Sequence, residues 1–548
     1  SIWAKKTDAA NAVSAKSRLK LDNTDRSGKS RTKTKVISES SGQAIQALIS
    51  KGETDASCRV TASCGKSSQE YTVNIKRIPT LSTLSVAGTS EDPVSMSPEF
   101  SSSTYQYRVS VTEDEKELVI DADAFSDKYT VEADGASKDS SGNFRAALSG
   151  DSQKITITVT GTNREKTQYG LNVVKKARVN CNFTDLLSGT VVCVTDKNGN
   201  DIFKGKAGSD GASLKAEKLL EGSEYRYSIT KKGYVGKSGT ITAGAKDSEI
   251  NGKLTEAAKN DSINTLIESS WPDFRGNTDN NGITAAQTPL KSSDTQLLWA
   301  VKNGSGWSGS PSSPIIVDDD IVFSTNREIV RVDRVTGEVK KRGTMAYKST
   351  FSITPPTYAE GMIFVALADG MIQAFNADTL ESLWIYQDPY KGQPNSPITY
   401  KDGYIYTGFW NSAVRNADYV CLSVTDEDPG KTDEEKTATW TYSHKGGFYW
   451  AGACAADNAV IVGSDDGSDT TASGTLYSFD PQTGNVLDKI DDISGDIRST
   501  VVYDSTTQRY CFTSSAGIFY TVKLGADGTF VKSSLTKLEL HPTDGNGN

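Results

Sequence analysis

The chain has 548 residues, too many for one hydrophobic core, so we expect three or four domains. It is 36% hydrophobic and 24% charged, with 47 glycines, 22 tyrosines and only two histidines, a composition typical of soluble β-rich proteins. The net charge of −9 argues against a nucleic-acid partner, and no apolar run approaches the roughly 20 residues of a membrane-spanning helix.

The first 78 residues begin with a polar stretch rich in Lys, Ser and Thr and end in two predicted strands, Ser57–Ser63 and Tyr71–Lys76. We expect residues 1–78 to be a partial or divergent β-sandwich module. Cys58 and Cys64 would lie about 20 Å apart on one extended strand, which is beyond the reach of a disulfide.

Residues 79–176 contain short alternating segments separated by turn residues, the pattern of an all-β sandwich. The predicted strands are Leu81–Val86, Tyr105–Val111, Glu117–Ala122, Lys154–Thr160 and Gln168–Val174. The segments Leu81-Ser-Thr-Leu-Ser-Val86, Ser97-Pro-Glu-Phe100 and Gly161-Thr-Asn163 resemble the cadherin-like β-sandwich module of bacterial surface proteins. The resemblance implies a spacer or interaction domain and no chemistry.

Residues 177–256 predict another small β-sandwich, similar in strand order to the carboxypeptidase-regulatory-like module, a structural domain. Val179–Phe183 and Thr190–Thr195 are predicted strands on either side of a short turn. Cys181 and Cys193 would then face each other across a hairpin, where a disulfide can form. The alternative is that they are two small, half-buried strand residues.

Oxygen-bearing side chains alternate at Asp196, Asn198 and Asn200, as they do in calcium-binding loops. No bidentate Glu follows at the required spacing, so a plain Asn-Gly hairpin turn is the competing interpretation. Residues 257–270 are expected to be a helical or irregular linker. Three cysteines in apolar strand contexts are predicted to be buried thiols: Cys421, Cys454 and Cys511.

From Trp271 onward an internal repeat dominates the sequence. Copies of a strand, a tight Asp or Gly turn and a second strand begin at Ser313, Pro355, Ser396, Gly452 and, more weakly, Ser499. Several copies are followed by two more strands joined by an Asp-x-x-Thr-Gly turn, such as Asp333–Gly337. Four strands per repeat of about 42 residues predict a β-propeller of five or more four-stranded blades over residues 271–548.

The opening Trp271-Pro-Asp-Phe-Arg-Gly276 and the Asp-x-x-Thr-Gly turns resemble the quinoprotein-like propeller family with PQQ-like repeats. In that family a Trp at the end of each repeat docks onto the neighbouring blade. Trp384 and Trp440 fit this role, whereas Val339 and Val486 stand where the other repeats would have Trp.

Two further segments of the repeat region carry specific expectations. Asp294–Lys302, which contains Trp299, is predicted to be an outer strand that closes the ring by joining the last blade. Residues 411–439 are rich in Asp, Glu and Lys and are predicted to be an inserted, exposed loop.

Dehydrogenases of this family bind PQQ and calcium and use an Asp base, often beside a pair of adjacent cysteines. This sequence has no Cys-Cys pair, only His444 and His541 for imidazole chemistry, and no Gly-x-Ser-x-Gly elbow or phosphate loop. We therefore expect no catalytic residues and no cofactor, PQQ and calcium included. A quinone-dependent oxidoreductase is the alternative.

Residues that precede the innermost strand of each blade converge at the mouth of a propeller's central channel. These residues are Trp307, Phe351, Asn395, Tyr449, Trp450, Asp496 and Arg498. Aromatic faces with a few polar groups suit a glycan or a protein segment, unless the aromatic side chains only fill the channel. Trp410 is expected to pack between blades, and Asp465 to lie in a solvated polar loop.

Serial β-modules and a propeller without catalytic groups predict an all-β, multidomain protein. We expect a secreted or cell-surface protein that binds a glycan or protein ligand through its propeller. A purely structural surface spacer without a ligand is a further alternative.

Overall fold

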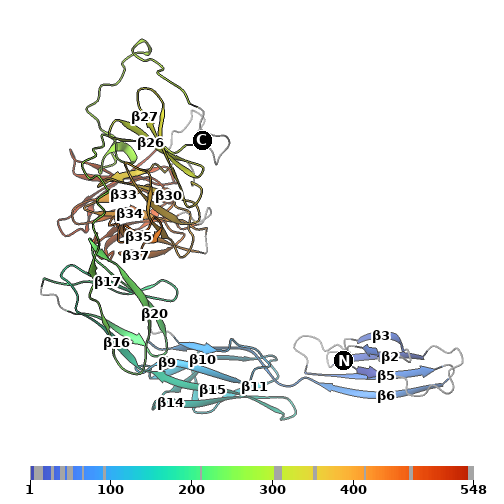
Figure 1. The fold of residues 1–548 in the computed structure, drawn as a ribbon. Helices are drawn as coiled ribbons and strands as arrows, with labels where there is room; N and C mark the ends of the chain where they lie inside the picture. Colours follow the sequence, from blue (N-terminus) through green and yellow to red (C-terminus); the bar gives the residue numbers. More distant parts are fainter. Residues whose placement is uncertain are drawn as a thin grey trace. The chain divides into compact units, whose positions relative to one another are not determined.

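The chain is almost entirely β-structure in the computed structural model (Figure 1). The structure describes residues 54–64, 67–90, 94–209, 213–301, 311–349, 354–412, 415–467 and 473–540, and earlier only strands 2–4, 17–25, 30–37 and 43–45. The chain divides into two compact units, Ser1–Arg178 and Val179–Asn548. The helices in these ranges are the 3-10 turns η1 (Phe274–Gly276) and η2 (Ser292–Asp294), and none is long and apolar enough to cross a bilayer.

The first unit starts with a four-stranded antiparallel sheet in the order β3-β2-β5-β6 and a two-stranded sheet β1-β4. The strands are β1 (Ile2–Ala4), β2 (Ser17–Asp25), β3 (Ser30–Ile37), β4 (Gln43–Ile45), β5 (Asp55–Cys64) and β6 (Ser67–Lys76). The two strands predicted in this segment are confirmed as β5 and β6. Cys58 and Cys64 lie on the same strand, as the sequence predicted, and Cys58 is a free thiol.

The second part of this unit is a sandwich of two sheets, β12-β13-β10-β7 and β11-β14-β15-β9-β8. Its strands are β7 (Leu81–Gly88), β8 (Ser95–Ser97), β9 (Gln106–Thr112), β10 (Glu117–Ala124), β11 (Thr130–Ala133), β12 (Ala136–Lys138), β13 (Phe144–Ala147), β14 (Ser152–Thr160) and β15 (Lys166–Lys176). Alternate residues of each strand enter one core, as Ile155, Ile157 and Val159 do from β14. All five predicted strands are confirmed, and the four that the sequence missed are short.

The second unit begins with a small two-sheet domain. One sheet has the order β19-β16-β23 and the other β18-β17-β20-β22, and β21 pairs with β24. The strands are β16 (Arg178–Thr184), β17 (Val191–Asp196), β18 (Asp201–Lys206), β19 (Leu214–Leu220), β20 (Glu224–Thr230), β21 (Tyr234–Val235), β22 (Lys237–Thr242), β23 (Ser248–Asn251) and β24 (Thr255–Glu256). The Asp196–Asn200 segment is a hairpin turn, in which the Asp196 carboxylate accepts the backbone N–H groups of Asn198 and Asn200.

The predicted disulfide between Cys181 and Cys193 is wrong, because β16 and β17 belong to different sheets and do not form a hairpin. Cys193 instead faces the propeller, where its Sγ lies 3.3 Å from the carbonyl oxygen of Thr439. Of the three predicted buried thiols, Cys421 and Cys454 are buried and Cys511 is half-buried.

The described residues of the propeller region form five consecutive sheets, here called blades 1 to 5, each with four antiparallel strands; a short fifth strand pairs in parallel at the edge of the second sheet. Blade 1 is β25 (Ile315–Val317), β26 (Asp320–Thr325), β27 (Glu328–Asp333) and β28 (Val339–Thr344), and blade 2 is β29 (Thr357–Ala359), β30 (Met362–Leu367), β31 (Met371–Asn376) and β32 (Ser382–Gln387). Blade 3 is β33 (Thr399–Lys401), β34 (Tyr404–Gly408), β35 (Asn416–Ser423) and β37 (Trp440–Lys445), and blade 4 is β38 (Cys454–Ala455), β39 (Val460–Gly463), β40 (Ser473–Phe479) and β41 (Val486–Ser494). Blade 5 is β42 (Val502–Asp504), β43 (Arg509–Thr513), β44 (Ile518–Leu524) and β45 (Phe530–Glu539). Buried apolar clusters join each blade to the next.

Tryptophans connect neighbouring blades as the repeat pattern predicted. Trp440, at the start of the last strand of blade 3, donates its indole N–H to the carbonyl oxygen of Pro481 in blade 4 at 3.0 Å. Its ring covers Gly484, whose φ of +71° and lack of a side chain allow the close contact. Trp384 is fully buried and donates to the carbonyl oxygen of Val424 in blade 3 at 3.4 Å.

Two expectations for this region are wrong. The described residues of the segment Asp294–Lys302, which are 294–301, do not complete blade 5, because β45 already supplies its fourth strand. Trp299 instead donates to the carbonyl oxygen of Arg334 in blade 1 at 3.0 Å. Residues 411–439 are not an exposed loop, because they contain β35, the third strand of blade 3, and β36 (Glu434–Glu435), which pairs with β32. The charged residues had indicated an exposed loop, but Lys436 is buried and ion-paired with Glu427.

The small domain packs against blades 3 and 4. Val191 and Cys193 join the apolar cluster that contains Trp440. The nearly buried side chain of Lys204 donates to the carbonyl oxygen of Thr441 and pairs with Asp201 at 2.8 Å. The segment predicted as a linker, residues 257–270, has no regular structure and runs along the blades, where Asn260 for example donates to Asp426.

Candidate functional site

A tight loop follows β37 and carries three consecutive aromatic residues. It starts at Gly446 and Gly447, which have φ values of +86° and +84°. A Cβ atom at Gly446 would lie 2.4 Å from the backbone of Asp466, so only glycine permits this approach of the two loops. Trp450, at the end of the aromatic run, has a φ of +60°, a conformation that residues with side chains rarely adopt and that is often found at functional sites.

Tyr449 and Trp450 of this loop stack on each other, and Tyr449 also contacts Trp410. The rings of Tyr449 and Trp450 are 4.3 Å apart with an interplanar angle of 22°, and the rings of Trp410 and Tyr449 are 4.6 Å apart. Trp450 remains 40% exposed, although it is a large hydrophobic residue. We refer to Trp410, Tyr449 and Trp450 as the aromatic platform.

Arg498 ties the platform to two buried carboxylates. Its guanidinium lies 5.1 Å from the ring centroid of Tyr449. It donates from Nε to Asp465 at 2.7 Å and from Nη2 to Asp496 at 2.9 Å. Asp465 also accepts the indole N–H of Trp410 at 3.1 Å, so residues of blades 3, 4 and 5 form one hydrogen-bonded group.

The site carries more negative than positive charge. Oxygen atoms of Asp465, Asp466 and Asp496 lie within 4.8 Å of one another, and Arg498 is paired with two of these carboxylates. Burial, together with the neighbouring carboxylates, raises the pKa of Asp496 to about 6. Burial also lowers the pKa of nearby His444, which favours its neutral form.

Comparison with known families agrees with this architecture. The family model of the cadherin-like β-sandwich domain matches residues 81–176, and the model described as outer membrane protein assembly factor BamB, built on PQQ-like repeats, matches residues 288–419. The chain carries a cadherin-like β-sandwich domain and a PQQ-like repeat propeller. No curated protein matches the sequence.

Solved structures similar to this chain include propeller enzymes at low identity. A europium-containing methanol dehydrogenase is 12% identical over 49% of this chain and 58% of its own, with a TM-score of 0.37. A quinohemoprotein alcohol dehydrogenase from Comamonas testosteroni is 14% identical over 51% of each chain, with a TM-score of 0.39. BamB from Moraxella catarrhalis is 12% identical over 40% of this chain and 71% of its own, with a TM-score of 0.23. The chain thus spans little more than half of the two dehydrogenases.

Two of the three carboxylates of this site are already paired with a cation. Asp465 and Asp496 are the buried acids of the platform, and both are ion-paired with the single guanidinium of Arg498. A metal ion would have to displace this cation from its two short ion pairs. We therefore derive no chemical step through a quinone or a metal ion.

The structure brings four of the predicted site residues together: Tyr449, Trp450, Asp496 and Arg498. Asn395 is buried beside them, where its side chain donates to Gln393, and the backbone of Gln393 pairs with that of Trp410. Trp307 and Phe351 lie outside the described residues.

The sequence predicted that Asp465 lies in a solvated loop, which is wrong because Asp465 is fully buried. It also predicted that Trp410 packs between blades, and the hydrogen bond from Trp410 of blade 3 to Asp465 of blade 4 agrees with this prediction. Trp410 follows the end of β34, and Asp465 follows the end of β39. In an antiparallel blade the second strand ends on the face where the first strand begins, so these positions belong to the same mouth. That rule would have identified both residues from the repeat alone.

Proposed function

We propose that this chain is a non-catalytic, secreted or cell-surface binding protein whose propeller binds a neutral glycan on the aromatic platform. The observation that carries the proposal is the exposure of Trp450, stacked on Tyr449 and supported by the Arg498 ion pairs. A stacked, pre-positioned aromatic surface loses little conformational entropy when a ligand binds.

The chemistry of the surroundings favours a sugar ring. The apolar C–H face of a pyranose packs on an indole ring, while its hydroxyl groups need donors and acceptors at the edge of that ring. Arg498, whose side chain is 28% exposed, supplies donors beside Tyr449. The excess negative charge of Asp465, Asp466 and Asp496 disfavours uronic acids and sulfated sugars, so we expect neutral glycans.

A glycan array followed by calorimetry with the best neutral oligosaccharide tests the proposal. Trp450→Ala should weaken binding by about tenfold or more, because one stacked face is lost. The matched control is Tyr105→Ala, since Tyr105 is 42% exposed and lies in the cadherin-like domain. Equal affinities of the wild type and Trp450→Ala, or a preference for acidic glycans, would contradict the proposal.

The oxidoreductase alternative has its own test. The protein is incubated with PQQ and calcium, and dye-linked oxidation of alcohols and sugars is followed. We expect no turnover, because Arg498 is ion-paired with two of the three carboxylates of the site. Turnover that depends on PQQ would overturn the non-catalytic assignment.

A further inference from the structure

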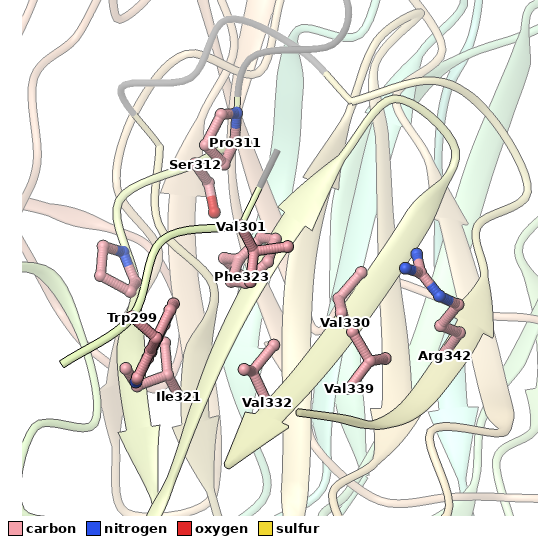
Figure 2. Close-up of a pocket in the computed structure, with 11 residues that line it drawn as sticks. Trp299, Val301, Pro311, Ser312, Ile321, Phe323, Val330, Val332, Val339 and Arg342 are labelled. Atoms are coloured by element: carbon pink, nitrogen blue, oxygen red, sulfur yellow. The ribbon is translucent and has the colours of Figure 1, made fainter. Parts of the chain in front are cut away.

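Blade 1 has an apolar face with a pocket of about 290 Å³ (Figure 2). Ile321 and Phe323 on β26, Val332 on β27 and Val339 on β28 line it, and Trp299 lies at one side. Arg342 stands at the opposite rim, where it pairs with Glu328 at 2.6 Å. The pocket is therefore apolar at its centre and charged at its edge.

The same face of the other blades is an interface. The cross-strand pair Ile321–Val332 of blade 1 corresponds to pairs in blades 2, 3 and 4: Ile363–Phe375, Ile405–Leu422 and Val460–Phe479. All six corresponding residues are fully buried, in clusters shared with the preceding blade. In blade 1, Ile321 and Phe323 are half-buried, whereas Val332 is only 4% exposed, so this face has the composition of a blade interface but is covered only in part.

The outer face of blade 5, at the other end of the series of blades, differs in composition from the pocket face of blade 1. Tyr510 and Phe512 of β43 face blade 4, so the alternating residue Arg509 points to the outer face of blade 5. Arg509 donates to Thr521 and to the carbonyl oxygen of Ser534, both at 2.8 Å. Arg509 and its partners therefore make part of this face polar, whereas apolar side chains line the centre of the blade 1 pocket.

Residues 296–301, beside the pocket, resemble the outermost strand of a blade. Trp299 donates to the carbonyl oxygen of Arg334 and covers Gly337, as Trp440 does with Pro481 and Gly484 between blades 3 and 4. Within the described part of the chain, residues 296–301 make no backbone hydrogen bond. Leu297 and Val301 are 80% and 55% exposed. This segment thus occupies the place of an outermost strand, and no described strand pairs with it.

We propose that blade 1 docks a β-hairpin or small sheet of a partner polypeptide, which pairs with residues 296–301 and fills the pocket with aliphatic side chains. The required chemistry follows from blade 2, whose equivalent face is covered by Ile315, Val317, Val322 and Ile329 of blade 1. The partner strand therefore carries β-branched aliphatic residues at alternate positions. Backbone pairing supplies affinity, and the pocket selects the side chains.

The probe is a synthetic, fluorescein-labelled peptide with the sequence of residues 313–333, which contains the strands that cover blade 2. We expect saturable binding to the full chain by fluorescence anisotropy, and none by a scrambled peptide. Phe323→Ser and Val339→Asp should each weaken binding by about tenfold or more, since each removes or charges the apolar centre of the pocket. Leu538→Asp on blade 5 is the matched control, because Leu538 is 61% exposed and lies outside the pocket.

Melting curves of the variants separate loss of binding from loss of folding. Peptide binding that survives both pocket variants in folded protein would overturn the proposal. So would light scattering that shows the wild type as a dimer and Phe323→Ser as a monomer, since the occupant would then be a second copy. Trp450→Ala should bind the peptide normally, so failure of the glycan proposal and failure of this one are distinguishable.

Discussion

A buried carboxyl in blade 2 makes stability depend on pH in a way that one substitution can test. Asp388 is fully buried, one of its oxygens accepts the backbone N–H of Gly392, and the other has no hydrogen-bond partner among the described residues. Burial, with the nearby carboxyl of Asp418, raises the pKa of Asp388 from 3.8 to about 8. The folded protein therefore holds this proton more tightly than the unfolded chain does.

The direction in which stability changes with pH follows from this difference in proton affinity between the folded and unfolded states. Between about pH 4 and pH 8 the folded state binds more protons than the unfolded state, so the free energy of unfolding falls as the pH rises. A pKa difference of about four, at about 1.4 kcal/mol for each pKa unit, sets an upper limit of roughly 6 kcal/mol for Asp388. Entry of water on ionisation reduces this cost, so we expect about 2 to 5 kcal/mol.

Asp388→Asn removes the ionisation and keeps the shape of the protonated acid. The variant and the wild type should have similar unfolding free energies near pH 5, and the variant should be more stable by about 2 to 5 kcal/mol near pH 9. Urea unfolding followed by tryptophan fluorescence reports on the propeller, which contains Asp388, because Trp3 is the only tryptophan before Trp271. Asp504→Asn is the control, since hydrogen bonds from Thr507 and Thr506 lower the pKa of exposed Asp504. A stability difference between Asp388→Asn and the wild type that does not change with pH would refute the reasoning.

Two more substitutions test how the propeller is held together. Gly484→Ala places a Cβ 2.4 Å from the Trp440 ring at a φ of +71° and should destabilise the propeller by about 2 to 4 kcal/mol in urea unfolding. Gly430→Ala, where the nearest atom is a side-chain oxygen at 3.3 Å, should change little, and equal effects of the two would contradict this. Lys204→Met removes the contact of the small domain with Thr441 and should speed hydrogen exchange in β37 by about tenfold. Lys206→Met, which loses only an exposed contact with Gln482, should leave that exchange unchanged, and unchanged exchange in Lys204→Met would argue against this role.

The propeller could be predicted from the repeat because each blade packs against its neighbour with the same arrangement of strands and turns. The hairpins that begin near Ser313, Pro355 and Ser396 became the first two strands of blades 1 to 3, and the Asp-x-x-Thr-Gly turns became the sites that receive Trp299 and Trp440. Local pattern failed where the partner of a strand is distant in sequence. β16 pairs in parallel with β23, with Cys181 opposite Ser248, and this long-range pairing places Cys181 and Cys193 in different sheets.

Charge patterns failed for a related reason. The acidic and basic residues of 411–439 indicated solvent, but Lys436 and Glu427 compensate each other in the buried interior, and Lys436 also lies 5.4 Å from the Trp384 ring. Asp465 was misjudged in the same way, because its partner Arg498 is in the next blade. A single sequence shows the charge of a residue but not the distant counter-charge that allows its burial.

The platform and the blade 1 face depend on different parts of the propeller. Trp410, Tyr449, Asp465 and Arg498 come from blades 3 to 5, and blade 1 contributes no described residue to their contacts. Phe323→Ser should therefore leave glycan affinity unchanged. Gly484→Ala acts between blades 3 and 4, whose loops form the platform, so it should weaken glycan binding together with stability. If glycan affinity instead fell in Phe323→Ser and not in Gly484→Ala, the ligand would bind at blade 1 and the platform assignment would fail.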